Sequence, residues 1–219
     1  IRRPRAPSAR VMPQPPTLTV CVTAHQCADR LPLLLTEARA YADELLVAVD
    51  DASTDDTLGV ARAYADRVLR FTSVGGRAGR ARLAGADLAK CDWVLFLDDD
   101  EGMDSAFPAL RDELLGAPVT HWYLPRRWLT QLDPPLHLTT GPWWPNWALR
   151  LARADSRLLG EPDPLHSSLL AVGPGGREPR TAILHYDRIV RTPAEIEDKV
   201  RRYQAMGQDS GGDAMYERD

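Results

Sequence analysis

The sequence contains no run of 18 or more apolar residues, so we expect no segment of it to cross a membrane as a helix. The N-terminus lacks the apolar core of a secretory signal, and it begins with Ile, which leaves an upstream start open. Cysteine is scarce: Cys21, Cys27 and Cys91 make an odd number without metal-site spacing. We interpret Cys21 and Cys91 as buried thiols, because both lie in or beside apolar runs. A reducing, cytoplasmic location suits such a chain better than a secretory route.

Acidic residues are absent from residues 1–28, which carry four arginines. The rest of the chain sets 23 Lys and Arg residues against 31 Asp and Glu residues, a net charge of −8. The net charge of the whole chain is −4, which argues against nucleic acid as the main partner because phosphate binding needs a basic face. The composition is 44% hydrophobic over 219 residues, which is enough to bury a core.

The composition changes along the chain in a way that predicts one folded domain between two tails. Residues 1–16 hold five prolines and four arginines, so we interpret them as a flexible basic arm. Residues 17–206 are expected to form a single domain, with residues 207–219 as a frayed tail. Within the domain, residues 17–115 and 116–206 differ in regularity and form two halves.

The first half alternates apolar strand patterns with helical patterns. The predicted strands are 18–22, 45–49, 68–71 and 93–97. Helices are expected after Asp29, which we interpret as a cap, over about 55–65 with caps from Ser53 and Thr54, and up to about Ala89. This order predicts an α/β fold with a mainly parallel sheet flanked by helices. The second half is irregular, with strands expected at 120–124, 147–151 and 181–186, and a capping box at Thr192–Glu195 that opens a last helix.

Acidic residues follow two of the predicted parallel strands. Asp50 and Asp51 follow the second strand, and Asp98–Glu101 follow the fourth. Ligands of such sheets bind outside the carboxyl ends of the strands. Because clustered carboxylates repel one another, we expect a hard cation such as Mg²⁺ or Mn²⁺ there, with phosphates of a nucleotide completing its shell. Asp55 and Asp56 are interpreted as helix-start residues.

These residues resemble the nucleotide-binding half of the inverting family 2 glycosyltransferases of GT-A fold. The resemblance covers about residues 18–113 and rests on two motifs in order, DDASTDDT at 50–57 and DWVLFLDDDE at 92–101. The lipopolysaccharide-core glucosyltransferase-like subgroup is the most similar, since it also carries Asp-Trp before the strand.

The resemblance implies roles for individual residues toward a nucleoside-diphosphate sugar. Thr23 and His25 match positions near the base and ribose, and Asp50 matches an Asp that accepts the base imide N–H, which favours uracil. Asp98 and Asp99 fall at the ribose and donor sugar, and Asp100 at the principal metal ligand, with Asp98 and His185 as further candidate ligands. Arg77 or Arg82 falls near the donor, although a solvated helix position is an equal alternative for Arg82. Leu83 departs from the family, which often has Asn there.

The second half is expected to bind the acceptor. Inverting transfer needs a general base, and within residues 161–166 we favour Asp163, with His166 second. Ser167 stands where the subgroup has Glu, and a structural role for this Pro-rich loop is an equal alternative. Trp143 and Trp144 are candidate platforms for an acceptor sugar, whereas Trp147 is interpreted as core. Arg126, Arg127 and Arg150 are expected either to meet an anionic acceptor or to balance surface charge.

We therefore expect a metal-dependent glycosyltransferase, and three other functions stay open. A nucleotidyltransferase would usually carry Gly and Lys after its first strand, and residues 23–29 have neither. A phospho-acceptor signalling domain would need Lys at a late strand end, but Lys90 and Lys199 fall on helices or their ends. A non-catalytic nucleotide-sugar-binding protein is the third alternative. The sugar, the acceptor and the oligomeric state are left open by the sequence.

Overall fold

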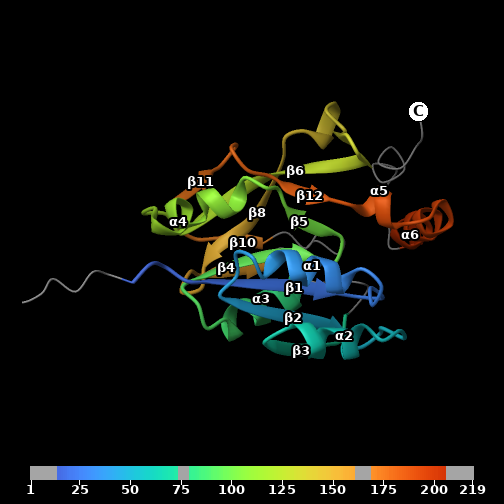
Figure 1. The fold of residues 1–219 in the computed structure, drawn as a ribbon, viewed down its shortest axis with the longest axis horizontal. Coiled ribbons are helices and arrows are strands. Elements are labelled where there is room, and N and C mark those ends of the chain that lie inside the picture. The colour runs from blue at the N-terminus through green and yellow to red at the C-terminus, as the bar shows by residue number, and fades with distance from the viewer. Residues whose placement is uncertain (1–13, 74–78, 161–168, 206–219) are drawn as a thin grey trace, which may run out of the picture.

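The structure is a computed structural model, and it describes residues 14–73, 79–160 and 169–205. Its centre is one mixed sheet of ten strands with helices packed on it (Figure 1). The strands that form the path of this sheet follow the order β3-β2-β1-β4-β8-β6-β12-β5, and β7 and β11 both pair with β6. A separate two-stranded sheet holds β9 (Leu158–Gly160) and β10 (Leu169–Ala171).

The first half of the chain forms the parallel part of the sheet, as predicted. Its strands are β1 (Leu18–Ala24), β2 (Glu44–Asp50), β3 (Arg67–Phe71) and β4 (Trp93–Asp98). The pairs β1–β2, β1–β4 and β2–β3 are all parallel. The helices between them are α1 (Leu31–Ala38), α2 (Thr57–Tyr64) and α3 (Gly79–Leu88), and α4 (Phe107–Gly116) follows.

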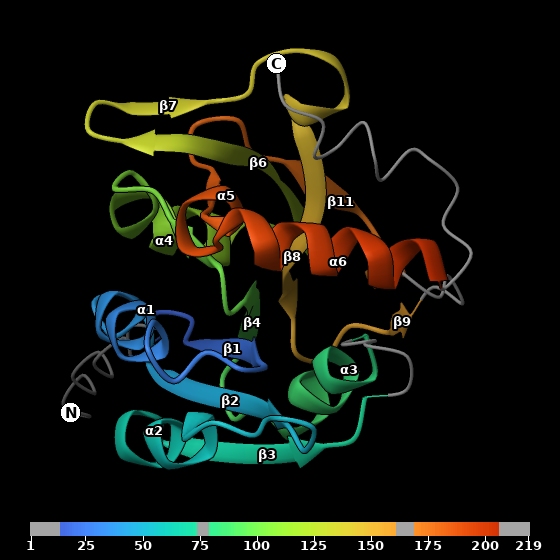
Figure 2. The ribbon, with the colours of Figure 1, turned by 90° about the vertical axis from the view of Figure 1, so that its right-hand side faces the viewer.

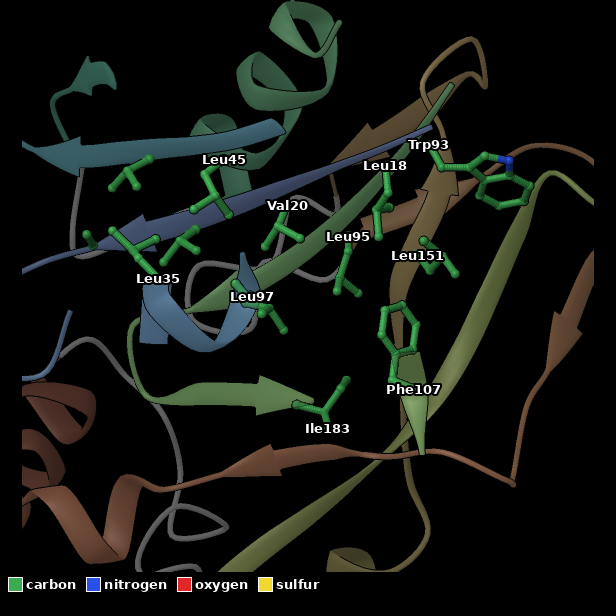
Figure 3. Close-up of a cluster of buried hydrophobic side chains, with 14 of the residues drawn as sticks. Leu18, Val20, Leu35, Leu45, Trp93, Leu95, Leu97, Phe107, Leu151 and Ile183 are labelled. Carbon is green, nitrogen blue, oxygen red and sulfur yellow. The ribbon is translucent and has the colours of Figure 1, made fainter. Parts of the chain in front are cut away.

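Both faces of β1, β2 and β4 are buried, which explains why these strands read as continuous apolar runs. Alternate residues of β1 and β4 pack on opposite sides: Leu18 and Leu95 contribute to one cluster, and Cys21 and Phe96 to the other. Figure 3 shows the first cluster, in which Phe107 and Ile183 bring α4 and the second half of the chain onto β1 and β4. α3 approaches β1 so closely that a Cβ on Gly85 would lie 2.4 Å from Cys21 Sγ. Cys91, in contrast, is only partly buried, so its interpretation as a buried thiol holds in part.

The second half adds long antiparallel strands to the β4 edge. β8 (Asn146–Arg153) pairs antiparallel with both β4 and β6 (His121–Leu132). Parallel pairing then attaches β12 (Ile183–His185) to β6, and β5 (Glu101–Met103) pairs antiparallel with β12. The remaining elements of this half are β7 (Pro135–His137), η1 (Gly141–Trp143), β11 (Gly175–Arg177), α5 (Asp187–Val190) and α6 (Pro193–Ala205).

Helix starts differ from the sequence prediction at two places and agree at a third. Asp29 does not cap α1, which follows Arg30 without a side-chain cap bond. α2 starts at Thr57 rather than Asp55, because Ser53 and Thr54 hydrogen-bond to Gln26 instead of capping the helix. The predicted capping box is correct: Glu195 Oε2 accepts from Thr192 N, and Thr192 Oγ1 accepts from Glu195 N.

Candidate functional site

The candidate site lies where β2, β1 and β4 end side by side. Since these strands are parallel neighbours, their carboxyl ends share one edge of the sheet. In the pairing register Thr23 is opposite Asp98, and the Thr23 hydroxyl donates a 2.8 Å hydrogen bond to Asp98 Oδ1. α5 and α6 lie on the side toward which β1 and β2 point (Figure 1), and in the turned view α6 runs in front of β8, above β1 and β2 (Figure 2).

His25 connects the two acidic groups that the sequence predicts at this edge. Its ring Nδ1 lies 3.5 Å from Asp50 Oδ2, and its backbone N–H donates to Asp99 Oδ2 at 3.0 Å. Asp50 is 5% exposed, and its Oδ1 accepts from the backbone N–H groups of Ala52 and Ser73. Burial alone would raise the pKa of Asp50, but the hydrogen bonds from Ser73 and Ala52 outweigh it and lower the pKa.

Gln26 fixes the loop after β1 against the loop after β2. It has φ of 48°, the left-handed region, and its side-chain Oε1 accepts from the backbone N–H groups of Thr54 and Asp55. Next to it, Ala28 N donates to Asp55 Oδ2 at 2.9 Å. Asp55 thus holds a neighbouring loop in addition to standing near the start of α2. These contacts set the position of His25 relative to Asp50.

Asp98 is bound by arginines from two other elements. Arg82 of α3 contacts Asp98 Oδ1, and Arg150 of β8 places Nη2 2.9 Å from Asp98 Oδ2. Burial would raise the pKa of Asp98, but the charges of Arg82 and Arg150 hold it well below its ordinary value. The solvated alternative for Arg82 is therefore wrong, because this residue is only 8% exposed.

Glu101, the last acid of the quartet, is fully buried in an ion-pair network. Arg150 Nη2 lies 2.8 Å from Glu101 Oε1, and Arg126 Nε lies 3.1 Å from the same oxygen. Arg126 and Arg150 therefore pair with buried acids rather than balance surface charge, and a contact with an acceptor stays a prediction. Arg127 instead pairs with Asp104 at 3.2 Å and lies over the Trp144 ring.

Asp99 and Asp100 meet a second group of basic side chains. Arg30 Nη2 lies 3.3 Å from Asp99 Oδ2, and Arg191 Nη2 lies 3.0 Å from Asp100 Oδ2. Burial and the charge of Asp100 raise the pKa of Asp99 to about 6. On the other side of Asp100, His185 Nε2 lies 3.6 Å from Oδ1. Burial lowers the pKa of His185, which therefore favours the neutral, metal-binding form.

The predicted metal ligands are brought together only in part. Asp100 and His185 face each other, whereas both oxygens of Asp98 are occupied by Thr23, Arg82 and Arg150. Among the described residues no group of three His, Cys, Asp or Glu side chains is arranged to hold a metal ion. The donor set of Asp100 and His185 suits a divalent cation that takes its other ligands from substrate. Arginines already neutralise part of the acidic quartet, and the expectation of a hard cation at this edge stays a prediction.

The aromatic residues of the second half line up on β6, β8 and the segment between them. Trp143 and Trp144 are partly buried: the Trp143 ring is edge-on to Trp128 at 5.0 Å, and Trp144 to His137 at 5.2 Å. Trp128 in turn contacts the His185 ring at 3.9 Å between centroids. Trp147, interpreted as core, is instead half-buried beneath the guanidinium of Arg177.

Three candidate residues, Arg77, Asp163 and His166, lie outside the described residues. Four other residues at this edge were not among the candidates: Gln26, Arg30, Trp128 and Arg191. Nothing in the sequence separates these two arginines from surface arginines, because their acidic partners are distant in the chain. Gln26 could have been suspected only from its position, because it directly follows the candidate His25 in the loop after the first strand.

Comparison with known proteins shows similarity to one sequence family and to several solved structures. The sequence model described as Glycosyl transferase family 2 matches residues 19–108. The comparison with curated proteins found no match. Among solved structures, glucosyl-3-phosphoglycerate synthase from Mycobacterium tuberculosis, in complex with Mn²⁺, UDP and glucosyl-3-phosphoglycerate, aligns with TM-score 0.50 and 17% identity over 87% of this chain and 77% of that chain.

TarS from S. aureus aligns with TM-score 0.50 and 15% identity over 87% of this chain. The chain spans 39% of that TarS structure and 55% of the shorter TarS 1–349, for which the TM-score is 0.43 at 18% identity. These identities support the fold alone. Membership of the lipopolysaccharide-core subgroup stays a prediction. The family match covers residues 19–108, which hold the parallel strands and the strand-end acids, so this part of the chain is similar to glycosyltransferase family 2 and the α/β fold is GT-A-like.

Proposed function

We propose that the protein transfers a sugar from a nucleoside-diphosphate donor, preferably a UDP-sugar, to a hydroxyl group of an acceptor with inversion at the anomeric carbon. The observation that carries this proposal is the meeting of Asp50 with Asp98–Asp100 at one sheet edge, joined by His25. Ligands of open α/β sheets bind at such an edge.

The two loops after β1 and β2 are proposed to hold the nucleoside. Asp50 is ionised and buried, so its carboxylate can accept an N–H from the uracil imide. Thr23 and His25 lie between Asp50 and Asp98, where the ribose would follow the base. Asp98 and Asp99 are then beside the donor sugar, and Arg77 is a further candidate for the donor.

Asp100 and His185 are proposed to hold Mg²⁺ or Mn²⁺ together with oxygens of the donor diphosphate. A bound metal supplies charge that stabilises the departing diphosphate. Asp98, the third predicted ligand, would need to leave at least one of its arginines to join them.

On the acceptor side, Asp163 is proposed as the general base that takes the proton of the attacking hydroxyl, with His166 as the second candidate. Trp143 and Trp144 are proposed to pack against an acceptor sugar. Trp143 contacts Trp128, which in turn contacts His185, and the neighbouring Trp144 packs against His137. No described helix is long and apolar enough to span a bilayer. A cytoplasmic location remains part of the proposal and rests on the sequence.

The deciding experiment is a calorimetric screen of nucleoside diphosphates and their sugars, with and without Mn²⁺, on the wild type and Asp100→Ala. We expect metal-dependent binding of UDP or a UDP-sugar that Asp100→Ala abolishes. Absence of any metal-dependent nucleotide binding, together with no effect of Asp100→Ala, would contradict the proposal. Release of pyrophosphate rather than a nucleoside diphosphate during turnover would indicate nucleotidyl transfer instead.

A further inference from the structure

The position of Arg191 at the acidic edge is the starting point. This arginine stands between α5 and α6, 91 residues along the chain from its partner Asp100. Its Nε lies 2.5 Å from Asp187 Oδ1, and its Nη2 lies 3.0 Å from Asp100 Oδ2 and 4.0 Å from Asp99 Oδ1. One guanidinium thus bridges three carboxylates, two of which belong to the strand-four motif.

Arg191 differs from Arg150, which pairs with other acids of the quartet, in its position in the fold and in the exposure of its side chain. Arg150 comes from the middle of the sheet, with a side chain only 5% exposed, and contacts Asp98 and the fully buried Glu101. Arg191 comes from a connection outside the sheet, with a side chain 22% exposed. It can therefore change partner by rotating its own side chain, whereas a change of partner by Arg150 would disturb the core.

A divalent metal at Asp100 and the Arg191 guanidinium compete for the charge of the same carboxylate. Two cations bound to the same carboxylate within about 4 Å repel each other by several kcal/mol at the dielectric of a protein surface. Binding of a metal to Asp100 and release of Arg191 are consequently linked, and each must weaken the other. The diphosphate of a nucleotide donor is the anion that such a metal would bring to this edge.

We propose that Arg191 is a built-in cation of the donor site: it neutralises Asp99 and Asp100, gives up Asp100 to a divalent metal, and then binds the donor diphosphate. The inference rests on the proposed function for the identity of the anion. Arginine suits the second role because its planar, five-donor guanidinium matches phosphate oxygens. Asp187 holds the Nε end, so the Nη end can turn while the side chain stays at the edge.

The test compares Arg191→Gln with the wild type in two titrations. In the first, electron paramagnetic resonance measures Mn²⁺ binding without nucleotide, and we expect Arg191→Gln to bind Mn²⁺ about tenfold more tightly because the competing cation is gone. In the second, calorimetry measures UDP and inorganic pyrophosphate at saturating Mn²⁺, and we expect about tenfold weaker binding of both. Because pyrophosphate has no nucleobase, its binding reports on the phosphate contacts alone.

Two further variants control for folding and for charge. Arg191→Lys keeps the cation, so its Mn²⁺ affinity should stay near that of the wild type, and thermal unfolding of each variant verifies the fold. Arg180→Gln removes another arginine that bridges two carboxylates, Glu113 and Glu178, and should change neither titration.

Equal Mn²⁺ affinity of Arg191→Gln and wild type would overturn the proposal, and so would unchanged pyrophosphate affinity at saturating Mn²⁺. If the wild type bound Mn²⁺ and pyrophosphate but no nucleoside diphosphate, the proposed function would fail while the role of Arg191 toward metal and phosphate stood.

Discussion

Arg150 and Glu101 form an ion pair inside the protein, with Arg150 Nη2 2.8 Å from Glu101 Oε1. Neither side chain is open to solvent, since Arg150 is 4% exposed and Glu101 is 0% exposed. The same guanidinium nitrogen also contacts Asp98. Arg150 of β8 thus binds two acids of the strand-four motif and fixes the position of that motif relative to the sheet.

Replacement of Arg150 by Met should lower the free energy of unfolding by about 3 kcal/mol, because it leaves buried carboxylates short of a partner. Arg126 and Arg82 remain near these acids, which places the loss at the lower end for a broken buried pair. Urea denaturation at neutral pH measures the change. Arg153→Met on the same strand is the control: the Arg153 side chain is 42% exposed and pairs with Asp155, so its loss should cost no more than about 1 kcal/mol.

Asp50→Asn should weaken UDP binding about tenfold and leave pyrophosphate binding unchanged, because the proposed contact of Asp50 is with the base. Asn keeps the shape but presents an amide whose N–H₂ meets the imide donor. Calorimetry with both ligands measures the difference. Asp51→Asn is the matched control, since the neighbouring Asp51 pairs with Arg70 instead. Equal losses for UDP and pyrophosphate would show that Asp50 acts on the diphosphate or the fold.

Gln26→Ala should loosen the two loops that carry His25 and Asp50. The substitution removes the acceptor of the Thr54 and Asp55 backbone N–H groups while leaving a residue with positive φ. We expect faster hydrogen exchange at these two amides, by about tenfold, with unchanged exchange in β1. Unchanged protection of Thr54 and Asp55 would mean that Gln26 does not hold the loops together.

The parallel half of the fold could be predicted because its physical signals are local. β1, β2 and β4 are buried on both faces, so each reads as a short apolar run, and acids mark where β2 and β4 end. Parallel pairing then brings Asp50 and Asp98 to one edge without further information. The helix start at Thr192 was predictable for the same reason, since its capping residues are three apart.

The ion pairs of the site could not be predicted, because their partners are distant in sequence. Arg150 is 52 residues from Asp98, and Arg191 is 91 residues from Asp100. The residues next to such an arginine in the sequence do not distinguish it from an arginine on the surface. Strands such as β5, β7 and β11 have three residues each, which is too short for a periodic pattern.

Asp163→Asn should reduce sugar transfer by about 10²- to 10⁴-fold while leaving UDP binding intact, if Asp163 is the general base. Asn cannot take the proton, but it does not alter the nucleoside side of the site. Single-turnover kinetics and calorimetry separate the two effects. Asp155→Asn, which changes an exposed acid paired with Arg153, should leave both unchanged. Unchanged transfer by Asp163→Asn would move the assignment to His166.

Glu44→Gln should destabilise the protein near pH 7 by about 1–2 kcal/mol, and this difference should fade in acid. Glu44 begins β2, at the far end from the site, and its Oε2 accepts from the Thr19 hydroxyl at 2.6 Å and from Lys90 N at 2.9 Å. Burial would raise the pKa of Glu44, but these hydrogen bonds and Arg67 lower it. Because the folded pKa is below the unfolded one, the stabilisation is complete above the unfolded pKa and is lost as pH falls through the folded pKa.

Urea denaturation of wild type and Glu44→Gln at several pH values between neutral and about pH 3 tests this dependence. The two stability curves should begin to converge near the ordinary glutamate pKa and meet below the lowered pKa of the folded state. Glu113→Gln is the exposed control, because Glu113 also pairs with an arginine, Arg180, but stands in solvent. A Glu44→Gln difference that stayed constant with pH would mean that the charge of Glu44 contributes nothing and that only the shape of its side chain matters.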